Sequence, residues 1–289
     1  MTQTKATLDR FHHISVTHVK GQVAPSFFAG DPHSHDHCEI FVHLAGRMDV
    51  FVEQNQYSLW GGEIRLYRSG ELHCGRTDHP QEMEWYQISI PHEFFLGEPG
   101  APLSPILFAR EAGTENVFYS GACEEITSLL SEVFASRTDG NPRWATYAES
   151  AVLRILCLLN ETRLNRAVSI RRNRALEQLL GAINTSFGRL STVEDLCALT
   201  HYSPSYVNRV FKTHMGITPY RFLLAKKLNE AKKALLAGCS VTEACEYAGF
   251  NSYNNFITLF RKTFRAPPGQ YRGKRTAIPA ESRAGKEPT

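Results

Sequence analysis

Two stretches of this sequence are variants of each other: VEDLCALTHYSPSYVNRVFKTHMGITPY at residues 193–220 and VTEACEYAGFNSYNNFITLFRKTFRAPPG at residues 241–269. With one extra residue in the second turn, Val193 aligns with Val241 and Phe211 with Phe260. A repeat of this length indicates a duplicated structural unit. Each copy is typical of a short apolar-faced helix, a tight turn and a second helix. This is the helix-turn-helix pattern, whose second helix enters the major groove of DNA.

The same residues resemble the DNA-binding domain of the AraC/XylS family of transcription regulators. The resemblance rests on the pieces SPSYVNRVFKTHMGITP, AGFNSYNNFITLFRKTF and PPGQYR, which lie between residues 203 and 272. Two residues depart from the family pattern, because Arg265 stands where Gly is usual and Lys227 where Arg is usual. We expect Arg265 to change how the last helix ends, and neither departure to change the fold.

The predicted DNA-binding domain covers residues 173–275. Besides the two helix-turn-helix units, helices are expected at 173–186 and 219–237. Ser203 is the expected N-cap of the first recognition helix, and Asn251 or Ser252 that of the second. A short basic linker at 166–172 precedes the domain, and a flexible tail at 276–289 follows it.

The second helix of each unit should bury one face and present the other to DNA. The presented residues are Ser205, Asn208 and Arg209 in the first unit and Tyr253, Asn254, Asn255 and Thr258 in the second. Arg can grip guanine and Asn adenine with two hydrogen bonds each, and Tyr or Thr can pack on a thymine methyl group. For Arg209, a salt bridge or a phosphate contact is the alternative. Phosphate contacts are expected from Lys212, Lys226, Lys227, Arg261 and Lys262.

Length and composition fit a globular protein of two domains. The chain has 289 residues, 42% of them hydrophobic and 21% charged. No apolar run approaches the ~20 residues of a membrane span, and the N-terminus lacks the apolar segment of a secretory signal. A cytoplasmic protein with no membrane partner is therefore expected. Seven scattered cysteines without a CxxC pair predict buried reduced thiols, with a redox switch or a cysteine metal site as the alternative.

Charge divides the chain into unlike halves. Residues 1–165 hold 12 basic and 21 acidic residues, a net charge of −9, whereas residues 166–275 hold 18 and 6, a net charge of +12. Because the basic half coincides with the helix-turn-helix repeat, its charge indicates a surface that faces phosphates. The acidic half, residues 1–165, must contact something other than nucleic-acid phosphates.

The N-terminal part, residues 1–121, has short apolar runs separated by turn signals, a pattern typical of a small antiparallel barrel or sandwich. Its segments HSHDHCE at 33–39 and GEIRLYRSGELH at 62–73 resemble the two cupin motifs, with Arg68 where Pro is usual. Residues 70–88 are similar to the sugar-binding domain of arabinose-responsive members of the AraC/XylS family. The sequence thus predicts a two-domain α+β protein with an N-terminal cupin-like β-barrel and a C-terminal all-α domain.

Four residues of the cupin-like segments form a candidate metal set: His33, His35, Glu39 and His73. Residues 33, 35 and 39 share parity, so a continuous strand aims them at one face. Three imidazoles and a carboxylate suit Zn, Fe, Ni or Mn. The alternative is a metal-free polar lining of an effector pocket, as in many regulators with this domain. We expect no metal and no other cofactor; His37 and His43 are further candidates for the same set.

An effector pocket is predicted from the strand that follows. Trp85, Gln87 and Ser89 alternate onto one face, and the family resemblance implies that sugar contacts come from the positions of Gln87 and Ser89. Trp85 offers an apolar ring face to a sugar, but it fits a plain core position as well.

Residues 122–165 change to helical periodicity, with helices expected at 122–137 and 144–164. The resemblance implies that this helical pair joins two subunits; a role as a cap on the barrel is the alternative.

The sequence therefore predicts a homodimeric, non-enzymatic transcription regulator. Its expected partners are double-stranded operator DNA, a small effector such as a sugar, and RNA polymerase if it activates transcription. The rival interpretation is a metal-dependent cupin enzyme or a metal-sensing regulator.

Overall fold

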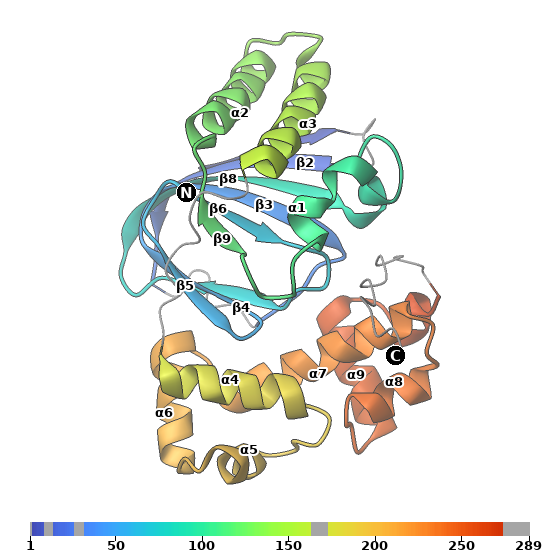
Figure 1. Cartoon of the computed structure of the whole chain (residues 1–289). Coiled ribbons are helices and arrows are strands. Elements are labelled where there is room, and N and C mark those ends of the chain that lie inside the picture. The colour runs from blue at the N-terminus through green and yellow to red at the C-terminus, as the bar shows by residue number, and fades with distance from the viewer. Residues whose placement is uncertain (1, 9–13, 26–31, 163–172, 274–289) are drawn as a thin grey trace, which may run out of the picture.

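The computed structural model describes residues 2–8, 14–25, 32–162 and 173–273, which form a β-rich N-terminal domain and a helical C-terminal domain (Figure 1). The predicted linker at 166–172 and tail at 276–289 lie outside the described residues. Among the described helices, none has the length and apolar character that a membrane crossing requires.

The N-terminal domain contains two antiparallel sheets. A six-stranded sheet has the order β1-β2-β8-β3-β6-β9, and a three-stranded sheet has the order β5-β4-β7. The strands are β1 (Thr2–Leu8), β2 (Ile14–Val23), β3 (His37–Ala45), β4 (Met48–Val52), β5 (Asn55–Leu59), β6 (Glu63–Tyr67), β7 (His73–Arg76), β8 (Gln81–Pro91) and β9 (Val117–Tyr119). The predicted barrel is therefore two facing sheets rather than one closed ring of strands.

An apolar core fills part of the space between the sheets. Val19, Met83 and Trp85 from the larger sheet pack with Val50 and Leu59 from the smaller one, and all five are 5% exposed or less. Strict alternation along the strands produces this core, since successive side chains point to opposite faces.

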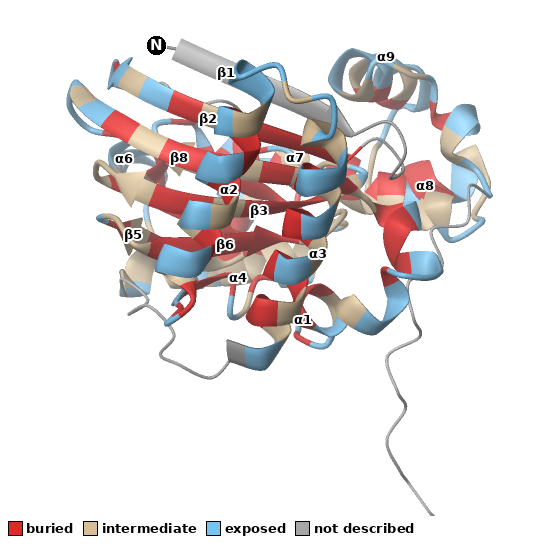
Figure 2. Ribbon diagram, turned by 90° about the horizontal axis from the view of Figure 1, so that it is seen from above, coloured by how far each residue is buried: buried red, intermediate tan, exposed pale blue. Residues whose placement is uncertain are grey.

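The outer face of the six-stranded sheet is covered by helices (Figure 2). These are α1 (Pro105–Phe108), α2 (Cys123–Thr138) and α3 (Trp144–Thr162). Helix α1 is joined to β8 through 3-10 turns at His92–Leu96 and Ala101–Leu103, and α2 and α3 follow β9. Apolar residues of the helices, such as Ile126 and Ile155, pack with Ile40 and Ile88 of the sheet. The predicted helical pair thus caps the β-domain.

The C-terminal domain has the helices expected of a double helix-turn-helix. They are α4 (Arg174–Ser186), α5 (Val193–Thr200), α6 (Pro204–Met215), α7 (Pro219–Leu236), α8 (Val241–Tyr247) and α9 (Tyr253–Phe264), with a closing 3-10 turn at Pro268–Tyr271. The hydroxyls of Ser203 and Ser252 accept hydrogen bonds from the N–H groups of Tyr206 and Asn255, which confirms both N-caps. Arg265 ends α9 in the left-handed conformation at φ 57°, the conformation that Gly commonly takes at this position. The helix therefore ends as it would with Gly, and the expected change of its end is not seen.

Candidate nucleic-acid interface and effector site

Helices α6 and α9 each bury the predicted core face. Val207 and Phe211 of α6, like Phe256 and Phe260 of α9, are fully buried. The opposite faces are exposed at every residue of these two helices that the sequence predicted for DNA contact: Ser205, Asn208, Arg209, Lys212, Tyr253, Asn254, Asn255, Thr258, Arg261 and Lys262. The orientation that base reading requires is therefore present in both helices.

Some of these side chains are held against their own helix. Nδ2 of Asn208 donates to the carbonyl of Pro204 at 2.9 Å, and the hydroxyl of Thr258 donates to the carbonyl of Asn254 at 2.9 Å. The guanidinium of Arg209 lies 5.2 Å from the ring centroid of Tyr206. These local contacts are weak enough to be exchanged for contacts with base edges.

Two of the expected phosphate contacts are wrong. Lys226 and Lys227 are each only 6% exposed. Nζ of Lys226 lies 2.7 Å from a carboxylate oxygen of Glu53 in the N-terminal domain, and Nζ of Lys227 donates to the carbonyl of Gly249 at 2.7 Å. Both lysines lie on α7, where docking of neighbouring elements buries them. They are structural and do not face DNA.

The inner face of the six-stranded sheet carries polar side chains in register. Glu39 of β3 lies opposite Ser89 of β8 and Tyr67 of β6. Nε2 of Gln87 donates to Oε1 of Glu39 at 2.6 Å and lies 3.3 Å from the hydroxyl oxygen of Ser89. Glu39 is 3% exposed, whereas Gln87 and Ser89 are half-buried. An amide, a carboxylate and a hydroxyl thus meet at one end of the space between the sheets.

Four histidines surround the same carboxylate. Nε2 of His35 and Nε2 of His73 lie 3.6 and 3.4 Å from Oε2 of Glu39, and Nε2 of His37 lies 3.4 Å from Oε1. His33 joins the set through two backbone hydrogen bonds to His73 of 3.0 and 2.9 Å. Ring nitrogens of His33, His35 and His73 all lie within 4.8 Å of one another. The predicted set is therefore brought together, with His37 as an additional member.

Protonation in this cluster follows from burial and charge. Burial lowers the pKa of His35 to about 3, although the carboxylate of Glu39 opposes the shift. Burial by itself would raise the pKa of Glu39, but hydrogen bonds from His37 and His73 outweigh it and hold that pKa well below its usual range. A neutral imidazole beside a charged carboxylate suits both metal ligation and hydrogen bonding to a polar ligand.

A buried ion pair fixes the loop that leads to His73. The two guanidinium nitrogens of Arg110 each lie 2.7 Å from a carboxylate oxygen of Glu71. Oε2 of Glu71 also accepts hydrogen bonds from the N–H of Arg68 and from Nδ2 of Asn116, at 2.8 and 3.1 Å. A two-point pair of this kind sets geometry as well as energy, so residues 68–73 are held rigidly beside the cluster.

Sequence reasoning missed two residues of the inner face. The ring of Tyr67 stacks on His73 at 4.1 Å between centroids, and Arg65 lies over Phe41 at 4.2 Å. The alternation of Glu63, Arg65 and Tyr67 along β6 was the available signal. Trp85 shares this face, but it is only 5% exposed and belongs to the apolar core between the sheets.

Comparison with known proteins gives two family matches. The AraC-like ligand binding domain matches residues 24–156, and a helix-turn-helix domain family matches residues 196–274. The HTH-type transcriptional activator RhaS of Salmonella arizonae is 31% identical over 254 residues, covering 86% of this chain and 89% of that protein. The chain belongs to the AraC/XylS family.

A second relative carries the same name. The activator RhaS of Klebsiella pneumoniae is 23% identical over 254 residues, covering 85% of this chain and 88% of that protein. A solved AraC-type transcriptional regulator from Chromobacterium violaceum is 22% identical over 36% of this chain and 93% of its own, with a TM-score of 0.33. This AraC/XylS member is thus a DNA-binding transcription regulator with an N-terminal ligand-binding domain. The names of its relatives suggest a regulator rather than an enzyme.

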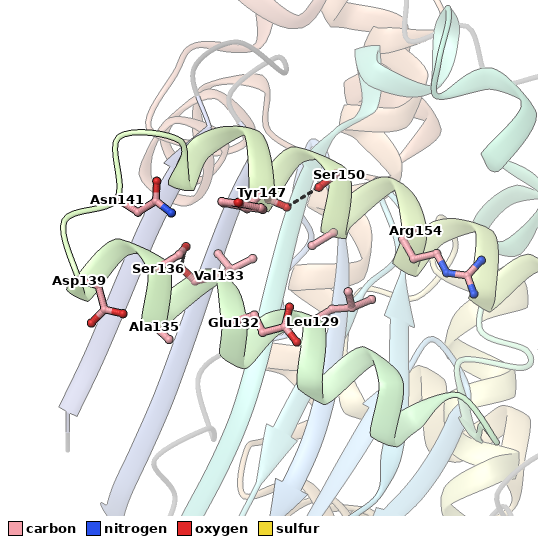
Figure 3. A pocket seen from close by; sticks show the side chains of 11 residues that line it. Leu129, Glu132, Val133, Ala135, Ser136, Asp139, Asn141, Tyr147, Ser150 and Arg154 are labelled. Atoms are coloured by element: carbon pink, nitrogen blue, oxygen red, sulfur yellow. Dashed lines mark hydrogen bonds between the residues drawn. The ribbon is translucent and has the colours of Figure 1, made fainter.

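In this AraC/XylS regulator a groove of about 490 Å³ runs between α2 and α3 (Figure 3). Apolar residues such as Leu129 and Val133 form its floor, and Tyr147, 52% exposed, stands at its edge. Glu132 of α2 and Asp139, directly after α2, line it together with Arg154 of α3, which forms an ion pair with Glu125 at 3.1 Å. The lining of the groove is therefore part apolar, with acidic groups on the α2 side and a basic group on the α3 side.

Proposed function

We propose that this regulator responds to a sugar or a closely related polar metabolite bound at the Glu39–Gln87–Ser89 cluster. One observation carries the proposal: a carboxylate, an amide and a hydroxyl lie within hydrogen-bond distance on a half-buried inner face. Sugar hydroxyls donate and accept at once, so they match a cluster that offers both acceptors and donors. Effector binding then biases the DNA-binding domain by favouring one arrangement of the chain.

Calorimetric titration with a panel of monosaccharides tests this effector class. Gln87→Ala removes the amide that bridges Glu39 and Ser89, so the affinity for the bound sugar should fall about 10- to 100-fold. Gln178→Ala, on α4 of the other domain, serves as the matched control and should leave sugar affinity unchanged. DNA binding by effector-free protein should not change in either variant. Failure of every sugar to bind the wild type contradicts the proposal.

A second candidate is metal sensing, and the ligand atoms of His33, His35 and His73 within 4.8 Å of one another favour it. These imidazoles, with Glu39, would hold a divalent first-row metal ion, which would act as the effector itself or anchor one. In that case His33→Ala or His35→Ala abolishes the response to the effector, and a chelator has the same effect on the wild type. Gln87→Ala then weakens the response only slightly. A chelator-sensitive response of the wild type would overturn the sugar-only pocket.

We also propose that two copies pair through α2 and α3. The groove between these helices is partly apolar, and its acidic and basic groups lie on different helices, so a two-fold axis can match each group with its opposite. Sedimentation of the wild type and of Tyr147→Glu tests this pairing. The wild type should sediment as a dimer, and the variant should shift toward monomer. A wild type that is already monomeric, or a variant that remains a dimer, contradicts the pairing. Because the relatives are named activators, we also propose that this chain contacts RNA polymerase.

A further inference from the structure

Helix α7 connects the two helix-turn-helix units and is docked on the N-terminal domain (Figure 1). Glu53, at the turn between β4 and β5, lies 2.7 Å from Nζ of Lys226 and 3.7 Å from Nζ of Lys233. Asn229, 1% exposed, donates from Nδ2 to the carbonyl of Gly70 at 3.0 Å. The N-terminal domain therefore holds the helix that positions both recognition helices.

The segment from His33 to His37 adds two further contacts to α7. The hydroxyl of Ser34 lies 2.5 Å from Oδ1 of Asn229, and the carboxylate of Asp36 forms an ion pair with the ammonium group of Lys232. Lys232 is 3% exposed whereas the side chain of Asp36 is 55% exposed, so this pair lies at the solvent-facing edge of the contact. The even-numbered residues of the segment thus face the DNA-binding domain.

The odd-numbered residues of the same segment face the other way. His33, His35 and His37 point to Glu39 and His73 in the cluster described above. One short piece of chain therefore has the candidate ligand cluster on one side and α7 on the other, because its odd- and even-numbered side chains make contacts on opposite sides.

A second path joins the same two places. The N–H of Gly70 donates to the carbonyl of His35 at 2.9 Å, and the carbonyl of Gly70 accepts from Asn229. A shift of His35 thus moves both hydrogen-bond partners of Asn229. Ser34 is the chain neighbour of His35, and the N–H of Gly70 is bonded to the carbonyl of His35.

We propose that residues 33–37 form a clasp through which occupancy of the histidine–Glu39 cluster controls docking of α7. The proposal rests on the proposed effector site and names its mode of regulation. In the docked state the ammonium groups of Lys232 and Lys233 are paired with Asp36 and Glu53, so they attract phosphate less. The state with the clasp open therefore binds DNA more tightly, and a ligand that displaces His35 shifts the chain toward it.

A double substitution on the even face tests the clasp in the full-length chain. Ser34→Ala with Asp36→Asn removes both contacts and leaves the histidines in place. The matched control is Ser128→Ala with Glu124→Gln on α2, which removes the same two groups at the opposite end of the domain. Affinity for a 30-base-pair duplex of random sequence is measured by fluorescence anisotropy at low salt, with and without Ni²⁺ as a probe of the histidine cluster.

The clasp predicts that the Ser34/Asp36 double variant binds duplex at least about threefold tighter than the control double variant. Ni²⁺ should change the duplex affinity of the wild type and change that of the clasp variant less, while calorimetry shows equal Ni²⁺ binding by both. Equal duplex affinities of the two double variants overturn the clasp, and so does a wild type that Ni²⁺ leaves unaffected. A wild type that binds no duplex overturns the regulatory function itself, and the clasp with it.

Discussion

Arg209 and Lys212 lie three residues apart on α6, both exposed, yet we expect them to contribute differently to binding. A guanidinium on the exposed face of a recognition helix can donate two hydrogen bonds to one guanine, whereas an ammonium group further along meets the phosphate backbone. Arg209→Ala should cost about 1–3 kcal/mol at one base pair and relax the preference there. Lys212→Ala should weaken binding to all sequences alike.

A panel of duplexes with single base-pair changes separates the two effects. The ratio of wild-type to variant affinity should depend on sequence for Arg209→Ala and stay flat for Lys212→Ala. If both ratios vary in the same way across the panel, the assignment of base reader and phosphate contact is wrong.

The sequence predicted most single residues of the two faces, but not their environments. Parity placed His33, His35 and Glu39 on one face, and the structure brings them together with His73. Trp85 was expected either as a pocket wall or as a core residue, and it lies in the core, because the facing sheet covers it. Which end of an inner face is filled by apolar side chains depends on the second sheet, and one strand's pattern does not contain that information.

At the scale of elements, the end of α9 shows how one residue departs from a family pattern. Arg265 has φ 57°, a conformation that costs a residue with a Cβ about 1–2 kcal/mol relative to the right-handed helix region. Arg265→Gly should therefore raise the free energy of unfolding by about 1 kcal/mol. Thermal denaturation measures the change.

Arg265→Ala is the matched control for this substitution. It removes the same charge and long side chain but keeps the Cβ and its strain. Stabilisation by Gly and not by Ala supports the backbone argument, whereas equal effects would assign the change to the lost charge.

The helices themselves were predictable because their local signals agree. Apolar spacing, an N-cap serine and a proline in the first turn all mark the start of α6 at Pro204. Lys226 and Lys227 were assigned to phosphate because a lysine on a basic domain is usually exposed. Their burial depends on Glu53, 173 residues from Lys226 along the chain, and on the turn at Gly249, so helical periodicity gave no sign of it.

At the scale of the whole molecule, the contact between the domains should depend on pH. Burial by itself would raise the pKa of Glu53, but the ammonium groups of Lys233 and Lys226 outweigh it and hold the pKa below its ordinary value of 4.5. A carboxyl group with a lowered pKa stabilises the folded state fully above that ordinary value. The stabilisation is lost as the pH falls through the folded-state pKa.

Glu53→Gln removes the titrating group and should lower stability at pH 7 by about 1–3 kcal/mol, since the lysines lose a charged partner. The difference in unfolding midpoint between wild type and variant should be largest at neutral pH and shrink below pH 4.5. A difference that stays constant from pH 7 to acid would show that the Glu53 charge contributes nothing to the contact.

The central claim is that one chain reads DNA through two recognition helices. Selection of binding sites from a random duplex library by the full-length protein tests it most directly. The account predicts that each copy of the chain selects two preferred blocks of sequence about 10 base pairs apart, one helical turn. Arg209→Ala should erode one block and Asn254→Ala the other. Selection that enriches no sequence, or substitutions that erode the same block, would contradict it.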